Sequence, residues 1–281
     1  MHDILDGVRV VSLAVNLPGP LAAARLASFG ATVTKVEPPM GDPLAAVVPD
    51  WYSELTGKQH VTVLDLKDSG DRAKLEDELA GADLLLTAMR PSALRRLGLD
   101  NAHEKFAGLS HIEIVGHDGD LEERPGHDLT YQAAYGTLQP PLMPTVPVVD
   151  LLGAERAVSA ALLALRNKSN STAGRRYRVV LEDAAADAGA AVRYGLSGPG
   201  DPLGGAIPTY GIYATADGYI ALGAVEPHFS ARTLEALGVA DTHEDLARVF
   251  AEENTSHWEE LAERVDIPIA GIRTPERGVV K

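Results

Sequence analysis

The first two thirds of the chain alternate short apolar runs with segments of helical periodicity. Runs rich in Val, Leu and Ile predict strands at residues 8–13, 31–36, 60–66, 82–88, 111–115 and 177–181. Apolar residues at helical spacing predict helices at residues 21–29, 71–79, 91–97 and 150–165, the last apolar nearly all round and therefore buried. Strands that alternate with helices predict an α/β fold with a doubly wound, mostly parallel, Rossmann-like sheet.

A different pattern follows the Gly- and Pro-rich segment at residues 198–205 (GPGDPLGG). Two strand-like runs at residues 208–213 and 219–225 flank Asp217-Gly218, a hairpin signal. Amphipathic helices are predicted at residues 229–237, 244–253 and around Trp258, followed by a strand-like run at residues 267–272. We therefore predict a large α/β domain at residues 1–200 and a smaller α+β domain at residues 201–281, whose C-terminal end can return to the large domain.

The turn after the first predicted strand argues against a dinucleotide cofactor. It reads Asn16-Leu-Pro-Gly-Pro20 and lacks the G-x-G-x-x-G spacing that lets the backbone approach a pyrophosphate. The sequence also lacks a P-loop lysine motif. Nicotinamide, flavin and nucleotide triphosphate chemistry are therefore not expected.

Composition narrows the function classes further. The 281 residues contain no cysteine, which excludes disulfides and thiolate nucleophiles, and the histidines show no metal-ligand spacing, so we predict no metal. A net charge of −15 disfavours binding to nucleic acid or to anionic lipid. With neither a basic leader nor a membrane-length apolar run, we expect a cytoplasmic protein that binds no membrane.

Two candidate acid/base groups lie at the ends of predicted elements. His127 stands in a Pro-Gly-His-Asp turn, and Asp150 follows a Pro-rich loop at the start of the long helix. Two such groups on opposite sides of one substrate atom can transfer a proton reversibly at carbon. An apolar helix entrance would raise the pKa of Asp150. The alternatives are structural: Asp150 as a helix N-cap, and His127 as a turn residue beside Asp128, itself expected to be an N-cap.

Six segments in order resemble the family III CoA-transferase superfamily, the carnitine dehydratase and bile-acid-inducible type. They are residues 5–44, 55–67, 89–100, 124–138, 148–165 and 208–229, which include the motifs GHD, VVDLLGAERA and GAVEP. Within the superfamily the chain looks closest to the α-methylacyl-CoA racemases. Transferases usually carry an aromatic residue where this chain has His127, which favours the racemase reading.

The resemblance implies roles for three residues. Asp150 matches the carboxylate that attacks the thioester in transferases, forming an acyl anhydride, and that acts as one of two bases in racemases. His127 matches the second racemase base, and Glu226 matches its acidic partner. The expected function is racemisation of the α-carbon of a 2-methylacyl-CoA, a step of lipid metabolism. The alternatives are CoA transfer between carboxylic acids through an aspartyl anhydride on Asp150, and a non-catalytic CoA-binding homologue.

The resemblance also implies the partners. Coenzyme A is expected as part of the acyl-CoA thioester substrate, with no tightly bound cofactor, and Lys58, Arg90 and Lys35 are the candidates to meet its phosphates. The family assembles as an interlocked homodimer in which large and small domains of different chains form each site. That assembly would bring Glu226 near the second chain's His127 and Asp150.

Several positions depart from the family pattern. Gln59 replaces a basic residue of the NKR segment, Pro38 and Pro39 stand where an Arg often follows the second strand, and VGHDGD at residues 115–120 replaces a Ser-Gly-Phe-Gly loop. The chain is also shorter than typical members. The acyl group is therefore left open by the sequence.

Overall fold

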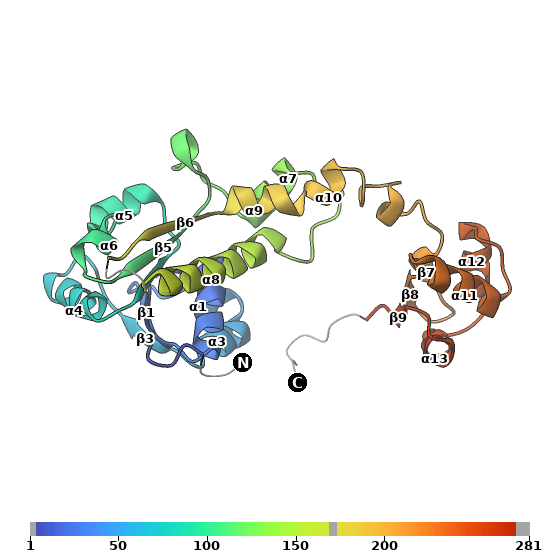
Figure 1. Cartoon of the computed structure of the whole chain (residues 1–281), viewed down its shortest axis with the longest axis horizontal. Helices are drawn as coiled ribbons and strands as arrows, with labels where there is room; N and C mark the ends of the chain where they lie inside the picture. The colour runs from blue at the N-terminus through green and yellow to red at the C-terminus, as the bar shows by residue number, and fades with distance from the viewer. Residues whose placement is uncertain (1–3, 169–172, 274–281) are drawn as a thin grey trace. The chain divides into compact units, whose positions relative to one another are not determined.

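The computed structural model describes residues 4–168 and 173–273 (Figure 1). The chain divides into two compact units, Met1–Gly189 and Ala190–Lys281. The sequence pattern placed this division after residue 200, at the Gly- and Pro-rich segment, which in the structure belongs to the second unit. The predicted return of the C-terminal end to the large domain falls on residues 274–281, outside the described residues.

The first unit is built on a six-stranded sheet in which every neighbouring pair is parallel. Its strands are β1 (Arg9–Ser12), β2 (Thr32–Glu37), β3 (His60–Val63), β4 (Leu84–Thr87), β5 (Ser110–Val115) and β6 (Arg176–Val180). Their order in the sheet is β3-β2-β1-β4-β5-β6, so the direction of winding reverses between β1 and β4. In such folds ligands bind outside the carboxyl ends of the strands at this reversal.

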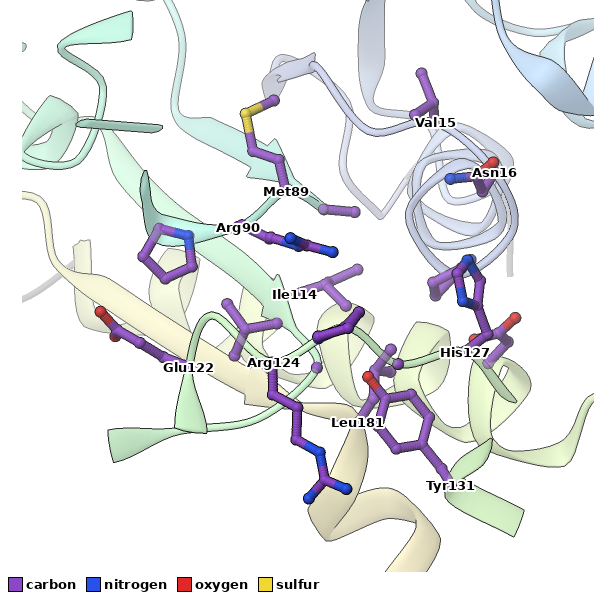
Figure 2. A pocket seen from close by; sticks show the side chains of 18 residues that line it. Val15, Asn16, Met89, Arg90, Ile114, Glu122, Arg124, His127, Tyr131 and Leu181 are labelled. Carbon is purple, nitrogen blue, oxygen red and sulfur yellow. The ribbon is translucent and has the colours of Figure 1, made fainter. Parts of the chain in front are cut away.

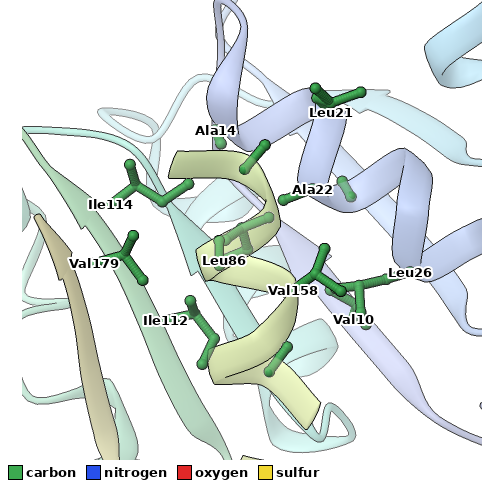
Figure 3. Close-up of a cluster of buried hydrophobic side chains, with 14 of the residues drawn as sticks. Val10, Ala14, Leu21, Ala22, Leu26, Leu86, Ile112, Ile114, Val158 and Val179 are labelled. Atoms are coloured by element: carbon green, nitrogen blue, oxygen red, sulfur yellow. The ribbon is translucent and has the colours of Figure 1, made fainter. Parts of the chain in front are cut away.

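Helices cover both faces of the sheet, as a doubly wound fold requires. They are α1 (Pro18–Ser28), α2 (Pro43–Val47), α3 (Pro49–Thr56), α4 (Ser69–Ala80), α5 (Pro91–Leu97), α6 (Ala102–Lys105), α7 (Asp128–Ala134), α8 (Val148–Lys168) and α9 (Leu181–Ala188), with a 3-10 turn at Gly119–Leu121. Helices α1 and α8 pack side by side on one face, as Figure 3 shows. Helices α4, α5 and α6 pack on the other.

Alternation along the strands gives the unit two apolar cores. In β5, Ile112 and Ile114 point toward α8, where Val158 packs near them (Figure 3). In β1 and β4, Val11 and Leu85 point to the opposite face, toward the α4–α6 layer. Successive side chains of a strand point to opposite faces of the sheet, and both faces are buried. The strands therefore read as continuous apolar runs in the sequence.

Helix α8 departs from its sequence prediction. Its buried stripe consists mostly of small residues, which allow close approach to α1 and to the sheet. Leu162 and Leu163, however, are 41% and 59% exposed. The prediction that the helix is buried all round is wrong for this face, because only one side of α8 packs against the sheet and its neighbouring helices.

The second unit is a small antiparallel sheet with amphipathic helices. Its elements are α10 (Ala190–Arg193), a 3-10 turn (Pro202–Gly204), β7 (Tyr210–Ala214), β8 (Tyr219–Gly223), α11 (Pro227–Leu237), α12 (His243–Phe250), α13 (Thr255–Val265) and β9 (Ile269–Gly271). The sheet order is β7-β8-β9. The Asp217 carboxylate in the hairpin turn accepts the backbone N–H of Thr255, and the Trp258 indole donates to the carbonyl of Phe250, so hairpin and helices form one core.

Candidate active site

A cavity of about 280 Å³ opens at the carboxyl ends of β1, β4 and β5, where the strand order reverses (Figure 2). Both His127 and Asp150 line it. The other side chains that bear on the chemistry are Asn16, Arg90, Arg124 and Tyr131. The structure therefore brings the two acid/base candidates, which stand at the starts of different helices, to one cavity.

His127 is presented by the N-terminus of α7. It is the N-cap residue of that helix, and its backbone N–H donates to the Thr130 hydroxyl at 3.0 Å while that hydroxyl donates to the His127 carbonyl at 2.8 Å. The cap therefore uses the backbone of His127 and leaves its ring available. Figure 2 shows the imidazole at the cavity wall.

Asp150 is the third residue of α8 and does not cap it. The cap comes from Asp128, whose Oδ1 accepts the backbone N–H groups of Val149 at 2.8 Å and of Asp150 at 3.2 Å. The Gln132 amide donates to the other Asp128 oxygen at 2.5 Å and fixes its orientation. The N-cap role considered for Asp150 thus belongs to Asp128, a residue of α7 that caps α8 from outside, and the Asp150 carboxyl group is left for chemistry.

The environment of Asp150 raises its pKa. Burial is the main cause and the nearby carboxylate of Asp128 the second, and together they move the pKa from 3.8 to about 6. This is the direction expected from the apolar helix entrance. A carboxyl group with this pKa exchanges protons readily near neutral pH, as a general acid or base must.

Two arginines line the same cavity. Arg90 precedes α5, and its guanidinium crosses the space in Figure 2, whereas Arg124 extends outward at the rim. Neither forms an ion pair within the part of the chain that the structure describes. Arg90 is one of the cations predicted from the sequence, whereas Arg124 is not, and its only local signal is its position two residues before the Gly-His-Asp turn.

A second cavity of about 490 Å³ lies at the carboxyl ends of β2 and β3 and shares Val15 and Met89 with the first. Its wall is largely apolar, with Leu64, Leu66, Met40, Pro38 and Pro39 among its residues. Lys67 is the cation in this wall, and it is not among the residues predicted from the sequence. The two cavities are neighbours along the carboxyl edge of the sheet, with Val15 and Met89 lining both.

Lys35 has a different role from the one predicted. Its side chain is fully buried, and its ammonium group lies 2.8 Å from Asp42 Oδ2, 3.2 Å from Glu37 Oε1 and 3.0 Å from the Ala14 carbonyl. Asp42 also accepts the backbone N–H of Asn16 at 3.0 Å. Because its side chain is buried in these contacts, Lys35 cannot meet a CoA phosphate in this arrangement. It instead holds the turn after β1, which forms one wall of the cavity.

Lys58 does not line either cavity, and Glu226 belongs to the second unit. Lys58 is exposed and precedes β3, at the amino end of the strand, whereas both cavities open at the carboxyl ends. Glu226 is exposed in the second unit, where it is the N-cap residue of α11 and makes no side-chain cap bond. Its relation to His127 is treated as a proposal below.

Replacing Lys35 by Met is expected to lower the free energy of unfolding by about 3–5 kcal/mol, because the variant leaves the buried carboxylates of Asp42 and Glu37 without their cation. Urea denaturation of the two proteins measures the difference. The exposed Lys58→Met variant is the control and should change stability by about 0.5 kcal/mol or less. Equal losses in the two variants would contradict the structural role of Lys35.

The described residues offer neither a metal site nor a membrane span. Within residues 4–168 and 173–273, no group of three or more His, Asp and Glu side chains is placed to hold a metal ion. None of the helices in these ranges has the length and apolar character that a membrane crossing requires.

Similar proteins carry out two kinds of acyl-CoA chemistry. The chain is 29% identical to the mouse alpha-methylacyl-CoA racemase over 98% of its length and 79% of that protein's. It is 28% identical to the succinyl-CoA–D-citramalate CoA-transferase of Chloroflexus aurantiacus, over 92% of this chain and 70% of the transferase. The fold matches the crystal structure of a hypothetical protein from Mycobacterium tuberculosis with a TM-score of 0.82, at 22% identity, covering 98% of this chain and 86% of the other. The model of CoA-transferase family III matches residues 5–280, and the chain belongs to that family.

Proposed function

We propose that this protein racemises the α-carbon of a 2-methylacyl-CoA thioester by two-base proton transfer. The observation that supports the proposal best is that His127 and Asp150 line one cavity at the reversal of the sheet. The raised pKa of Asp150 and the position of the His127 ring at the cavity wall suit the two roles. Similarity to the mouse racemase over nearly the whole chain supports the same reaction.

The reaction is balanced without an oxidant or a metal. One base removes the α-proton, and the electrons of the C–H bond move into the thioester to form an enolate. The conjugate acid of the other base then delivers a proton to the opposite face of the same carbon, and the carbonyl re-forms. The product has the opposite configuration at the α-carbon, and each base ends in the protonation state that the reverse reaction requires.

The cavities suggest how the CoA part binds. The larger apolar cavity suits the flat adenine or the pantetheine chain, and because Val15 and Met89 line both cavities, a ligand that passes them would bring its thioester to His127 and Asp150. Arg90, Arg124 and Lys67 are the cations placed to meet the phosphates. In this proposal CoA arrives with the substrate and leaves with the product.

We keep Glu226 as the acidic partner of His127 in an interlocked homodimer. Its exposed carboxylate has no cap bond to break, so it is available to an imidazole of a second chain. A carboxylate beside the ring would hold one tautomer and stabilise the imidazolium that forms during turnover. Light scattering that gives the mass of a single 29.7 kDa chain would remove this part of the proposal.

CoA transfer is the alternative that the site also supports. Because Asp128 supplies the cap of α8, the Asp150 carboxylate is free to attack a thioester carbonyl and form an acyl anhydride. Similarity to the Chloroflexus transferase favours the same alternative. In this reaction His127 would have no proton to transfer at the α-carbon.

Incubation with one enantiomer of a 2-methylacyl-CoA in heavy water tests the proposal. Racemisation is expected to introduce deuterium at the α-carbon together with the opposite configuration, measured by mass spectrometry and chiral chromatography. Exchange of CoA onto a free acid without deuterium uptake, with hydroxylamine trapping of an acyl group on Asp150, would instead identify a transferase. Saturable CoA binding with neither activity would identify a non-catalytic homologue and overturn both reactions.

A further inference from the structure

Tyr131 is a buried residue of the cavity that the two-base scheme does not use. It lies one helical turn after His127 in α7, so both side chains reach the same side of the helix. The residue is only 3% exposed, yet it lines the cavity, and Figure 2 shows its hydroxyl group turned toward the interior. The ring is thus enclosed by protein while its polar end faces the substrate space.

Two glycines define the position of this hydroxyl group. A Cβ atom built on Gly116 would lie 2.2 Å from the Tyr131 oxygen, and one built on Gly126 would lie 2.3 Å from it. No side chain larger than hydrogen fits at either position with the phenol in place. The hydroxyl group is therefore held between the backbone after β5 and the backbone before α7.

The edge of the ring is held by a second pair of residues. The buried His117 meets Tyr131 edge-to-face at 5.3 Å between ring centroids. His117 Nδ1 in turn lies 2.7 Å from Glu182 Oε2, and the Tyr135 hydroxyl donates to Glu182 Oε1 at 3.2 Å. These residues come from the β5–α7 loop, α9 and α7, so three elements fix the direction of the phenol.

The hydroxyl group itself has no protein partner among the described residues. Because the residue lines the cavity, the hydroxyl group is available to donate to a ligand oxygen there. Burial and the charges of Asp150 and Glu182 raise the pKa of Tyr131, so the phenol stays neutral and can donate. The charge that develops during α-proton removal is on the thioester oxygen.

We propose that the Tyr131 hydroxyl group donates a hydrogen bond to the thioester oxygen of the bound acyl-CoA and is a catalytic residue of this chain. The bond strengthens as the enolate forms, because the oxygen then carries negative charge. His117 and Glu182 act as positioning residues for the phenol. This inference rests on the proposed acyl-CoA function, in which racemase and transferase both develop charge on that oxygen.

Tyr131→Phe is expected to lower kcat about 100-fold while changing KM less than about threefold, because the bond is stronger in the transition state than in the bound substrate. Tyr177→Phe on β6 is the matched control, because it removes a hydroxyl that accepts a hydrogen bond from Asn167 of α8, and it should keep wild-type kcat. A Tyr131→Phe variant within about threefold of wild-type kcat would overturn the inference. A wild-type protein without either activity would overturn the proposed function instead.

An infrared measurement tests the bond without turnover. The probe is a ¹³C-carbonyl-labelled 2,2-dimethylacyl-CoA, which has no α-hydrogen to remove. Bound to the wild type, its carbonyl stretch is expected at lower frequency than in solution, and the shift should largely disappear in Tyr131→Phe. The same frequency in both proteins would show that the hydroxyl does not contact the thioester oxygen.

Gly116→Ala tests whether the hydroxyl position matters. The new methyl group would clash with the Tyr131 oxygen at 2.2 Å, whereas the next ring atom is 3.5 Å away. The substitution should therefore lower kcat and Tm in the wild-type background and be nearly neutral in the Tyr131→Phe background. Equal effects in the two backgrounds would contradict the placement of the Tyr131 hydroxyl group against Gly116.

Discussion

Replacing Asp150 by Asn is expected to lower racemisation or CoA transfer on the order of 10³-fold or more and, at pH 8, to stabilise the protein. The amide can neither accept a proton nor attack a thioester, so the loss of activity follows for both candidate reactions. The gain in stability follows because the native fold holds a partly buried carboxylate beside Asp128. Catalytic function and stability therefore change in opposite directions at this residue.

The sign of the pH dependence follows from the raised pKa. Between pH 3.8 and about 6 the folded state binds more protons at Asp150 than the unfolded state, so stability falls as the pH rises through this window. A pKa change from 3.8 to about 6 corresponds to at most about 3 kcal/mol, reduced by the partial exposure of the carboxyl group. Asp150→Asn removes this loss, so the two proteins should differ at pH 8 and converge near pH 4.

Urea denaturation at pH 4.5 and pH 8 measures this difference. Asp183→Asn is the matched control, because Asp183 is also the third residue of its helix, α9, but is exposed. That variant should change the free energy of unfolding by about 0.5 kcal/mol or less at both pH values. A wild-type protein more stable than Asp150→Asn at pH 8 would show that the carboxylate is stabilised by the fold and not strained in it.

The strands and the long helices were predictable because burial imposes a simple pattern on them. Strand β5 keeps its period of two over the run His111–Val115. Helix α8 keeps a period of 3.6 from near Asp150 onward, so both are long enough to be recognised. Short helices such as α2 and α9 lacked this repetition. Helix α9 begins directly at Leu181, where the sequence pattern continued the strand.

The site was predictable only in part, because distant contacts decide it. The motifs identified His127 and Asp150, and the sheet order brings both to one cavity. The local sequence could not show that Asp128 caps α8 across twenty residues of chain, since that bond depends on how α7 packs against α8.

Charge near a strand end proved to be a weak guide to phosphate binding. Lys35 follows the general rule that a cation at the end of a strand can meet an anion, but its side chain points to Asp42 and Glu37 inside the fold. Lys67 was not singled out, because nothing in its neighbouring residues separates a cavity cation from a solvated one, and the local signal for Arg124 was only its position before the Gly-His-Asp turn. Whether a cation lines a cavity or faces solvent depends on the direction of its side chain, and the local sequence does not encode that direction.

His127→Ala is expected to separate the two reactions. For a racemase, interconversion of the enantiomers should fall about 10²- to 10⁴-fold, because one face of the α-carbon loses its base. For a transferase that uses Asp150 alone, CoA exchange should fall less than about tenfold. His60→Ala, at an exposed histidine that begins β3, is the control and should leave either activity unchanged.

The surviving base gives this variant a second, sharper signature. In His127→Ala, Asp150 can still remove the α-proton from the enantiomer that faces it and, after exchange with solvent, return deuterium to the same face. Deuterium uptake should therefore persist for one enantiomer without inversion, and Asp150→Asn should show the same behaviour for the other enantiomer through His127. Opposite enantiomer preferences in the two variants would require bases on opposite faces of one carbon. Uptake into both enantiomers by either variant would mean that a single group serves both faces, and the two-base assignment would be wrong.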